Sequence, residues 1–187
     1  MKPVPLVIAA VLLCAPIEFD SVPKIPNREV AVVEQVKTQP KKTETKKQSF
    51  TVYTIHGITP NVEWQKALYK ELKRNGIAWY MPYAVCQIFQ ESRWNQYADS
   101  GKGDKGITQQ KEVYWYGRAA RYGASGASIW DVYAQFKVYA GMMAGYLKSS
   151  KNDIGWALSY YFYGNGQRAD KYVHDVLSHM DYLKEVK

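Results

Sequence analysis

From residue 60 onward, apolar residues recur at three- and four-residue spacing in several separate segments of the chain. This is the period of an α-helix that buries one face. The apolar positions are Trp64, Ala67, Leu68 and Leu72; Ala84, Val85, Ile88 and Phe89; Trp130, Tyr133, Phe136, Ala140, Met143 and Leu147; Ile154, Ala157, Leu158 and Tyr161; and Tyr172, Val173, Val176, Leu177, Met180 and Leu183. No stretch alternates convincingly between apolar and polar residues over the length of a strand. The sequence therefore predicts a mainly α domain.

Local signals place the ends of some of these helices. Thr59-Pro60 predicts a helix start with Pro60 at the first helical position, where the missing N–H of proline is tolerated. Asn75-Gly76 predicts the end of the same helix. The next helix runs into Glu91, and the last pattern predicts an amphipathic C-terminal helix that includes Leu183.

The N-terminal part of the chain has a different composition. Met1-Lys2 is followed by the apolar run PVPLVIAAVLLCAPI, which predicts a secretory signal peptide or short membrane anchor at residues 1–17. Residues 18–50 are rich in Pro, Lys, Thr, Glu and Gln, so we expect a disordered, flexible linker there. We therefore expect export to the periplasmic or extracellular cell-wall space, with an uncleaved N-terminal membrane anchor as the alternative, and a catalytic domain at 51–187.

The net charge of +8 over 187 residues favours an anionic partner, which could be nucleic acid, a membrane surface or a bacterial wall. The densest lysine run, at 41–47, lies in the expected linker and is interpreted as solvated charge, so we expect no nucleic-acid partner. Cys14 and Cys86 lie in regions of different character, and the three histidines show no metal-ligand spacing. We therefore expect neither a disulfide nor a metal site.

Glu91 borders the apolar face formed by Val85, Ile88 and Phe89. Partial burial raises the pKa of a carboxyl group, because it disfavours the charged form. A carboxyl group that holds its proton near neutral pH can deliver that proton to a poorly basic leaving group, such as a glycosidic oxygen. Glu91 is thus a candidate general acid.

A polar loop with several glycines follows Glu91. Glycine permits tight turns and a close approach of backbone to ligand. No G-K-[ST] occurs in the loop, which excludes a P-loop. Neutral hydrogen-bonding side chains, which suit hydroxyl and N-acetyl groups better than phosphates, stand at Ser100, Thr108, Gln109 and Gln110.

Three motifs together resemble those of lytic transglycosylases of the soluble-lytic (SLT) type, which are relatives of goose-type lysozyme. The first comprises Glu91-Ser92, Asn95, Ala98, Ser100, Gly103 and Gly106-Ile107-Thr108-Gln109. The second, ALSYYFYG at 157–164, resembles the family's A-L-A-A-Y-N-A-G. The third, at 172–177, resembles its closing Y-V-x-x-V-L helix. The resemblance covers residues 60–183, and the motifs stand in the family's order.

This resemblance implies a lysozyme-like helical domain with a glycan-binding cleft. The implied substrate is the β-1,4 bond between N-acetylmuramic acid and N-acetylglucosamine in peptidoglycan glycan strands, and no cofactor is implied. Glu91 would act as general acid and then as general base. The substrate's acetamido group would assist, and the muramic 6-hydroxyl would attack to give a 1,6-anhydro product.

The matched positions imply substrate-binding roles for Ser92, Ser100, Gln109 and Tyr161. Three of them have a structural alternative: Ser92 could cap the helix, Gln109 could organise the loop, and Tyr161 could pack in the core. Aromatic residues that could stack on sugars are Trp94, Tyr97, Trp115 and Tyr163, although any one such residue more often belongs to the core.

The chain departs from the family pattern at several positions. Asp104 stands where Ala is usual, Gln110 and Glu112 replace a hydrophobic residue and a Pro, and Phe162 replaces the Asn after the motif tyrosine. Two alternative functions stay open. One is a goose-type hydrolase in which Asp99 or Asp104 orients a water molecule, and the other is a non-catalytic glycan-binding module.

Overall fold

The computed structural model describes residues 50–164 and 166–186, and this part of the chain is mainly helical, as the sequence predicts. The signal peptide or anchor expected at 1–17 and residues 18–49 of the linker expected at 18–50 lie outside the described residues, while Phe50 is described and packs against the core. The helices are α1 (Val62–Arg74), α2 (Met81–Ser92), α3 (Glu112–Arg121), α4 (Val132–Ser149), α5 (Ile154–Tyr163) and α6 (Asp170–Ser178), with short 3-10 helices η1 (Ala78–Tyr80) and η2 (His179–Tyr182). No helix among the described residues is both long and apolar enough to cross a membrane.

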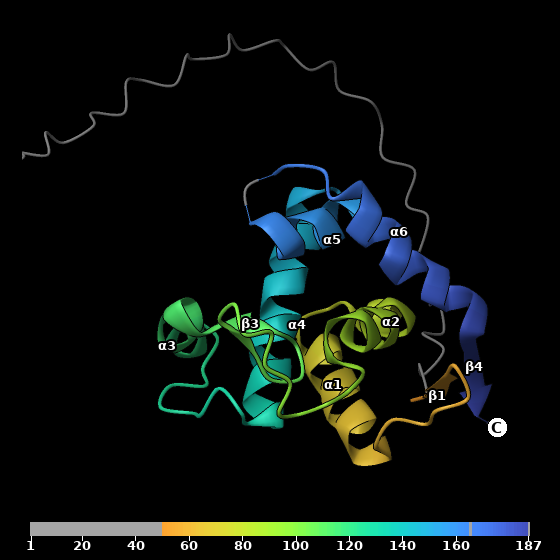
Figure 1. Ribbon diagram of the computed structural model, residues 1–187, viewed down its shortest axis with the longest axis horizontal. Coiled ribbons are helices and arrows are strands. Elements are labelled where there is room, and N and C mark those ends of the chain that lie inside the picture. The colour runs from red at the N-terminus through yellow and green to blue at the C-terminus, as the bar shows by residue number, and fades with distance from the viewer. Residues whose placement is uncertain (1–49, 165, 187) are drawn as a thin grey trace, which may run out of the picture. The chain divides into compact units, whose positions relative to one another are not determined.

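Helix α4 lies at the centre of the helical domain (Figure 1). Its side chains Phe136, Tyr139 and Met143 are fully buried, and they share one core with Leu68 and Leu72 of α1. Helices α2, α5 and α6 complete this core, while α3 packs against the other side of α4 in a smaller cluster. The buried positions of α1, α2, α4 and α5 follow the helical period of the sequence.

The start of α1 differs from the prediction. Asn61 caps the helix, because its Oδ1 accepts hydrogen bonds from the backbone N–H of Glu63 at 2.9 Å and of Trp64 at 3.2 Å. Pro60 therefore precedes the cap and is not the first helical residue. The predicted end is confirmed: Asn75 caps α1, and Gly76 turns the chain with a φ of +75°.

Two short antiparallel ribbons accompany the helices. Strand β1 (Val52–Ile55) pairs with β4 (Leu183–Val186), so that Ile55 lies opposite Leu183, and β2 (Asp104–Lys105) pairs with β3 (Gln110–Lys111). The predicted C-terminal helix is an α-helix to Ser178 and continues as the 3-10 helix η2 to Tyr182, but the prediction is wrong at Leu183, where β4 begins. Leu183 still packs against the core, but its backbone pairs with β1, a partner that a local pattern does not reveal.

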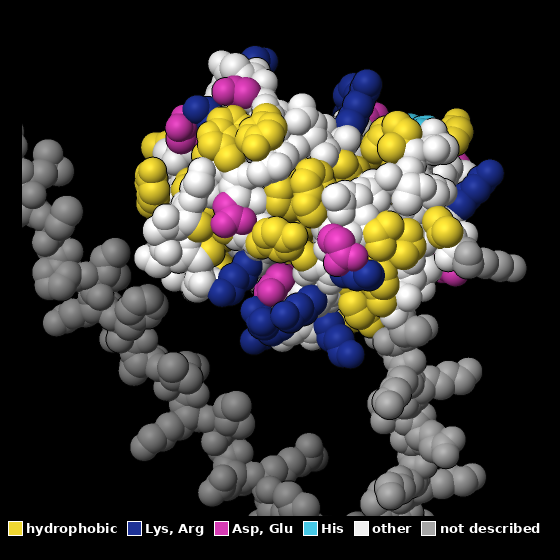
Figure 2. Space-filling model, turned by 90° about the horizontal axis from the view of Figure 1, so that it is seen from below, with side chains coloured by type: hydrophobic (Ala, Val, Ile, Leu, Met, Phe, Trp, Pro, Cys, Tyr) yellow, Lys and Arg dark blue, Asp and Glu magenta, His cyan; other side chains and the backbone are white. Residues whose placement is uncertain are grey.

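The surface is mixed in character. Figure 2 shows one face, on which hydrophobic side chains lie in separate groups between charged ones. Several charged groups are paired, including Lys105 with Glu112 at 2.8 Å and Lys111 with Asp104 at 2.8 Å. Among large hydrophobic residues, Tyr97, Val113, Tyr116 and Tyr133 are exposed.

Candidate active site

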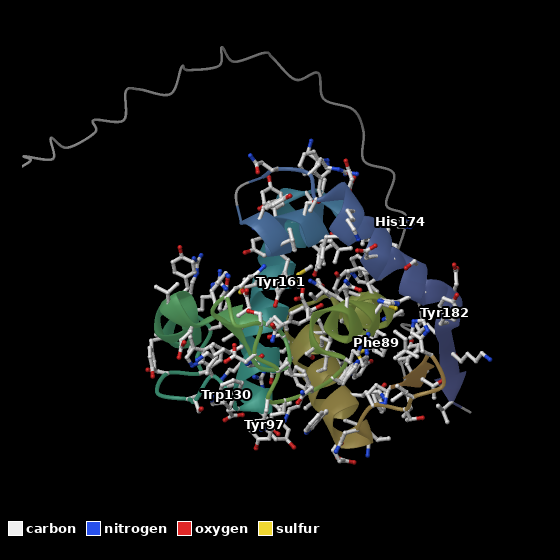
Figure 3. All side chains as sticks on the ribbon, in the orientation of Figure 1. Phe89, Tyr97, Trp130, Tyr161, His174 and Tyr182 are labelled. Atoms are coloured by element: carbon white, nitrogen blue, oxygen red, sulfur yellow. The ribbon has the colours of Figure 1, made fainter. Side chains whose placement is uncertain are left out.

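Glu91 lies in the last turn of α2 and lines a pocket of about 640 Å³. Segments that are distant in the sequence meet there, because α2, the β2–β3 hairpin, α3, α4 and α5 all contribute residues. Figure 3 shows Tyr161 of α5 between the upper helices and the segment that contains β3. The lining residues are Glu91, Asp104, Gln109, Gln110, Lys111, Tyr114, Arg118, Met142, Tyr161, Phe162, Tyr163 and Gly164.

The carboxyl group of Glu91 is held by one direct hydrogen bond. The buried hydroxyl of Tyr172, on α6, donates to Glu91 Oε1. Burial raises the pKa of Glu91 to about 7; the hydrogen bond from Tyr172 opposes this rise, and the charge of Asp104 adds to it. Near neutral pH the carboxyl group therefore exists in both protonation states, as a group that must give and then take a proton requires.

Tyr161 is fixed by the backbone and side chains of the loop after Glu91. Its hydroxyl donates to the carbonyl oxygen of Thr108 at 2.5 Å and accepts from Gln110 Nε2 at 2.7 Å. Gln110 Oε1 in turn accepts from the Arg118 guanidinium at 2.9 Å. Burial raises the pKa of Tyr161 well above its ordinary value, so this hydroxyl stays neutral and can both donate and accept.

The loop between α2 and β3 is fastened to two helices. Ser92 Oγ donates to the carbonyl oxygen of Ile107 at 2.7 Å, which ties the loop to α2. On the other side, Gln135 of α4 accepts from the N–H of Thr108 at 2.7 Å and donates to the carbonyl oxygen of Lys105 at 3.1 Å. Gly106 is required there, because its φ is +76° and a Cβ atom would lie only 1.7 Å from Gln135 Nε2.

The predicted site residues fall into two groups. Glu91, Gln109 and Tyr161 line the pocket together, and Gln109 Nε2 also donates to the carbonyl oxygens of Ala98 and Gly106. Ser92 and Ser100 do not line it. Ser100 is exposed, and its Oγ accepts from the N–H groups of Lys102 and Asp104. Their predicted contacts with substrate stay predictions.

Several residues of the site were not singled out from the sequence. Tyr172 was placed on a helix face and in the third motif without a role at the site, yet its hydroxyl contacts Glu91 and its ring stacks on Phe162 at 4.6 Å between centroids. Gln110 was noted as a neutral hydrogen-bonding side chain of the loop and as a polar replacement for a hydrophobic residue, but its bonds to Tyr161 and Arg118 were not predicted. Of the aromatic candidates, Trp94 and Trp115 are buried, Tyr97 is exposed, and Tyr163 lines the pocket.

The acidic and basic groups of the pocket do not form a metal site. Within 50–164 and 166–186, no cluster of three or more His, Cys, Asp or Glu residues could hold a metal ion. Asp104 is the second carboxyl group of the pocket, and it pairs with Lys111. The pocket therefore offers a carboxyl group with a raised pKa, Glu91, surrounded by neutral hydrogen-bond donors, aromatic rings and the two cations Lys111 and Arg118.

Comparison of the chain with protein-family models, with curated proteins and with solved structures gave no match.

Proposed function

We propose that this protein is a peptidoglycan lytic transglycosylase with a lysozyme-like fold, and that the Glu91 pocket is its glycan cleft. The observation that carries the proposal is the position of Glu91 in the wall of the pocket, where burial raises its pKa to about 7, a value that fits a carboxyl group that donates and then accepts a proton. The glycosidic oxygen is poorly basic, so its departure from carbon requires such a donor.

The reaction proceeds in two half-steps. In the first, Glu91 gives its proton to the oxygen that links the two sugars, and the C1–O4 bond breaks as the acetamido oxygen of the muramic residue bonds to C1. In the second, the muramic 6-hydroxyl attacks C1 and displaces the acetamido oxygen, and its proton passes to the Glu91 carboxylate. Glu91 ends in its starting state, and the product is a 1,6-anhydro sugar.

The rest of the pocket suits a glycan. Tyr114, Phe162 and Tyr163 are exposed aromatic residues that line it, and such rings pack against the apolar faces of sugars. Gln109 and Gln110 supply amide groups that can bind hydroxyl and N-acetyl groups. Lys111 and Arg118 add positive charge, which suits the acidic peptides that wall glycans carry.

A second candidate is hydrolysis, in which Asp104 orients an attacking water molecule. It is favoured by the presence of Asp104 in the pocket and by the effect of its charge on Glu91. Asp99 does not line the pocket, and its Oδ1 accepts from the N–H of Gly101 at 2.8 Å. Hydrolysis would give a reducing sugar in place of the anhydro ring.

Mass spectrometry of the fragments released from purified peptidoglycan separates these candidates. We expect anhydro-muropeptides, which are lighter by one water than the products of hydrolysis. Reducing muropeptides alone would favour the Asp104 alternative. Binding of the wall without release of any fragment would contradict both reactions and would indicate a non-catalytic glycan-binding module.

A further inference from the structure

Behind Glu91, one turn earlier in α2, the buried side chain of Gln87 joins three tyrosine hydroxyls. Its Oε1 accepts from Tyr80 at 3.1 Å and from Tyr139 at 2.7 Å, and its Nε2 donates to the hydroxyl of Tyr172 at 3.1 Å. Gln87, Tyr80 and Tyr139 are fully buried. These bonds and the one from Tyr172 to Glu91 form a continuous hydrogen-bonded chain from the core to the pocket.

The direction of these hydrogen bonds, from donor to acceptor, follows from the number of hydrogen atoms that each hydroxyl group can donate. A tyrosine hydroxyl has one hydrogen, and both Tyr80 and Tyr139 direct theirs to Gln87 Oε1. If the amide group were turned around, at least one of these buried hydrogens would lose its acceptor. Nε2 must therefore face Tyr172, and the hydroxyl of Tyr172, which accepts this bond, directs its single hydrogen to Glu91.

Packing alone does not account for Gln87. The other buried residues of α2 are Met81, Ala84, Val85, Cys86 and Ile88, all of them apolar. A buried amide group destabilises the fold unless its polar atoms are bonded, so an apolar side chain would serve the core more simply. Gln87 lies four residues before Glu91 on the same helix, and its hydrogen bond to Tyr172 links it to the carboxyl group.

We propose that Gln87 is a positioning residue for Glu91, which acts through Tyr172. The Tyr172 hydrogen bond occupies Oε1, so that Oε2 is the oxygen that carries the proton and delivers it to the substrate. This inference rests on the proposed function for its catalytic consequence, but its structural part concerns the carboxyl group alone and can be measured without substrate.

The effect of removing the amide group has a definite sign. A hydroxyl group that accepts one hydrogen bond forms a stronger hydrogen bond as a donor. Loss of the donor at Gln87 therefore weakens the hydrogen bond from Tyr172 to Glu91. Since that bond lowers the pKa of Glu91, its weakening raises this pKa further. The alkaline limb of the activity profile, where Glu91 loses its proton, moves to higher pH, and kcat falls because Oε2 is less well placed.

The test compares Gln87→Met, a substitution of similar size, with the unchanged protein. The carboxyl carbon of Glu91 is followed by NMR across the pH range in carbon-13-labelled protein, and kcat and KM are measured on soluble glycan fragments. We expect a higher pKa for Glu91, a kcat lower by about tenfold and a nearly unchanged KM.

Gln65→Met is the matched control. Gln65 is also a fully buried glutamine. Its side-chain amide group forms hydrogen bonds with the backbone of Tyr53 and Pro60, and neither of these residues contacts Glu91. We expect this variant to lower the melting temperature without moving the titration of Glu91. Tyr139→Phe is a milder second variant, which removes one of the two donors to Oε1 and should shift the titration in the same direction by less.

An unchanged Glu91 titration in a folded Gln87→Met variant would overturn the inference; if that variant does not fold, an unchanged titration in Tyr139→Phe would do so. A shift equally large in Gln65→Met would also overturn it. Failure of the unchanged protein to cleave glycan would overturn the proposed function only, since the titration decides the role of Gln87 separately.

Discussion

At the scale of single residues, the protonation of Glu91 ties stability to the same group that we expect to perform catalysis. Its pKa is raised by burial from an ordinary value near 4.5 to about 7. The folded state therefore binds this proton more tightly than the unfolded chain does. The contribution of Glu91 to the free energy of unfolding is favourable at low pH and is lost as pH rises through about 7.

We predict that Glu91→Gln stabilises the protein at pH 8 but changes its stability little at pH 4. Glutamine stays neutral at both pH values and can still accept the hydrogen bond from Tyr172, so it avoids the cost of a buried charge. Thermal melting of both proteins at the two pH values checks this. Equal melting temperatures at pH 8 would contradict the burial of Glu91 and the raised pKa that follows from it.

Tyr161→Phe tests the hydrogen bonds that hold the loop. The ring keeps its packing against Tyr139, but the bonds to Thr108 and Gln110 are lost. We predict a loss of about tenfold in wall-cleaving activity and a destabilisation of about 1 kcal/mol. The control is Tyr133→Phe, an exposed tyrosine of α4 outside the pocket, which should leave both quantities unchanged. Full activity of Tyr161→Phe would show that its hydroxyl is not needed.

At the scale of elements, a contact between two histidine rings joins the segment after β1 to η2. His56, just after β1, lies with its Nε2 at 2.9 Å from Nδ1 of His179 in η2, and the other ring nitrogen of His179 lies 2.9 Å from Gln90 Oε1 of α2. Figure 3 shows Phe89 and Tyr182, which both stack on His56, in the same region. Two protonated rings would place N–H groups against each other, so this contact requires at least one neutral ring.

We predict that this junction weakens in mild acid. Burial and the charge of His56 lower the pKa of His179, while Asp175 opposes them. The unfolded chain then binds the proton more tightly, so the free energy of unfolding decreases as pH falls through about 6.5. Melting temperatures should be compared in the Glu91→Gln background, because Glu91 titrates over a neighbouring range with the opposite sign. His179→Gln should flatten the acid dependence, and an unchanged slope would rule out this histidine as its source.

The periodicity of apolar residues in the sequence predicted the helices that bury one whole face in the core. Helices α1, α2, α4 and α5 were predicted because their core positions recur at helical spacing. Helix α3 was not, since only Trp115 and Ala119 of it are buried, whereas Val113 and Tyr116 are exposed and hide the period. The β1–β4 pair joins opposite ends of the described chain, and no local pattern encodes such a pairing.

The site was predictable to a similar extent. Glu91, Gln109 and Tyr161 came from motif positions, and the structure places them in one pocket. The roles of Gln110 and Tyr172 depend on partners far away in the sequence, namely Tyr161 for the first and Glu91 for the second. Only the folded arrangement reveals such roles.

At the scale of the whole molecule, the net charge of +8 should assist binding to an anionic wall. We predict that cleavage of insoluble peptidoglycan slows as salt is raised from about 0.05 M to about 0.5 M, because screening shortens the reach of surface charge. Cleavage of short neutral glycan fragments should be insensitive to the same change, since a neutral substrate has no charge for the salt to screen. Equal salt dependence for both substrates would contradict a role for net charge in wall binding.

In the proposed reaction, Glu91 is both the proton donor and the proton acceptor for glycan cleavage. The most direct test is the rate at which soluble fragments are released from purified peptidoglycan at pH 6 by the unchanged protein and by Glu91→Gln, with melting curves to show that both are folded. We predict a loss of at least about a thousandfold, because one group serves both half-steps and glutamine can neither give nor take the proton. Release of fragments at the unchanged rate by folded Glu91→Gln would contradict the account.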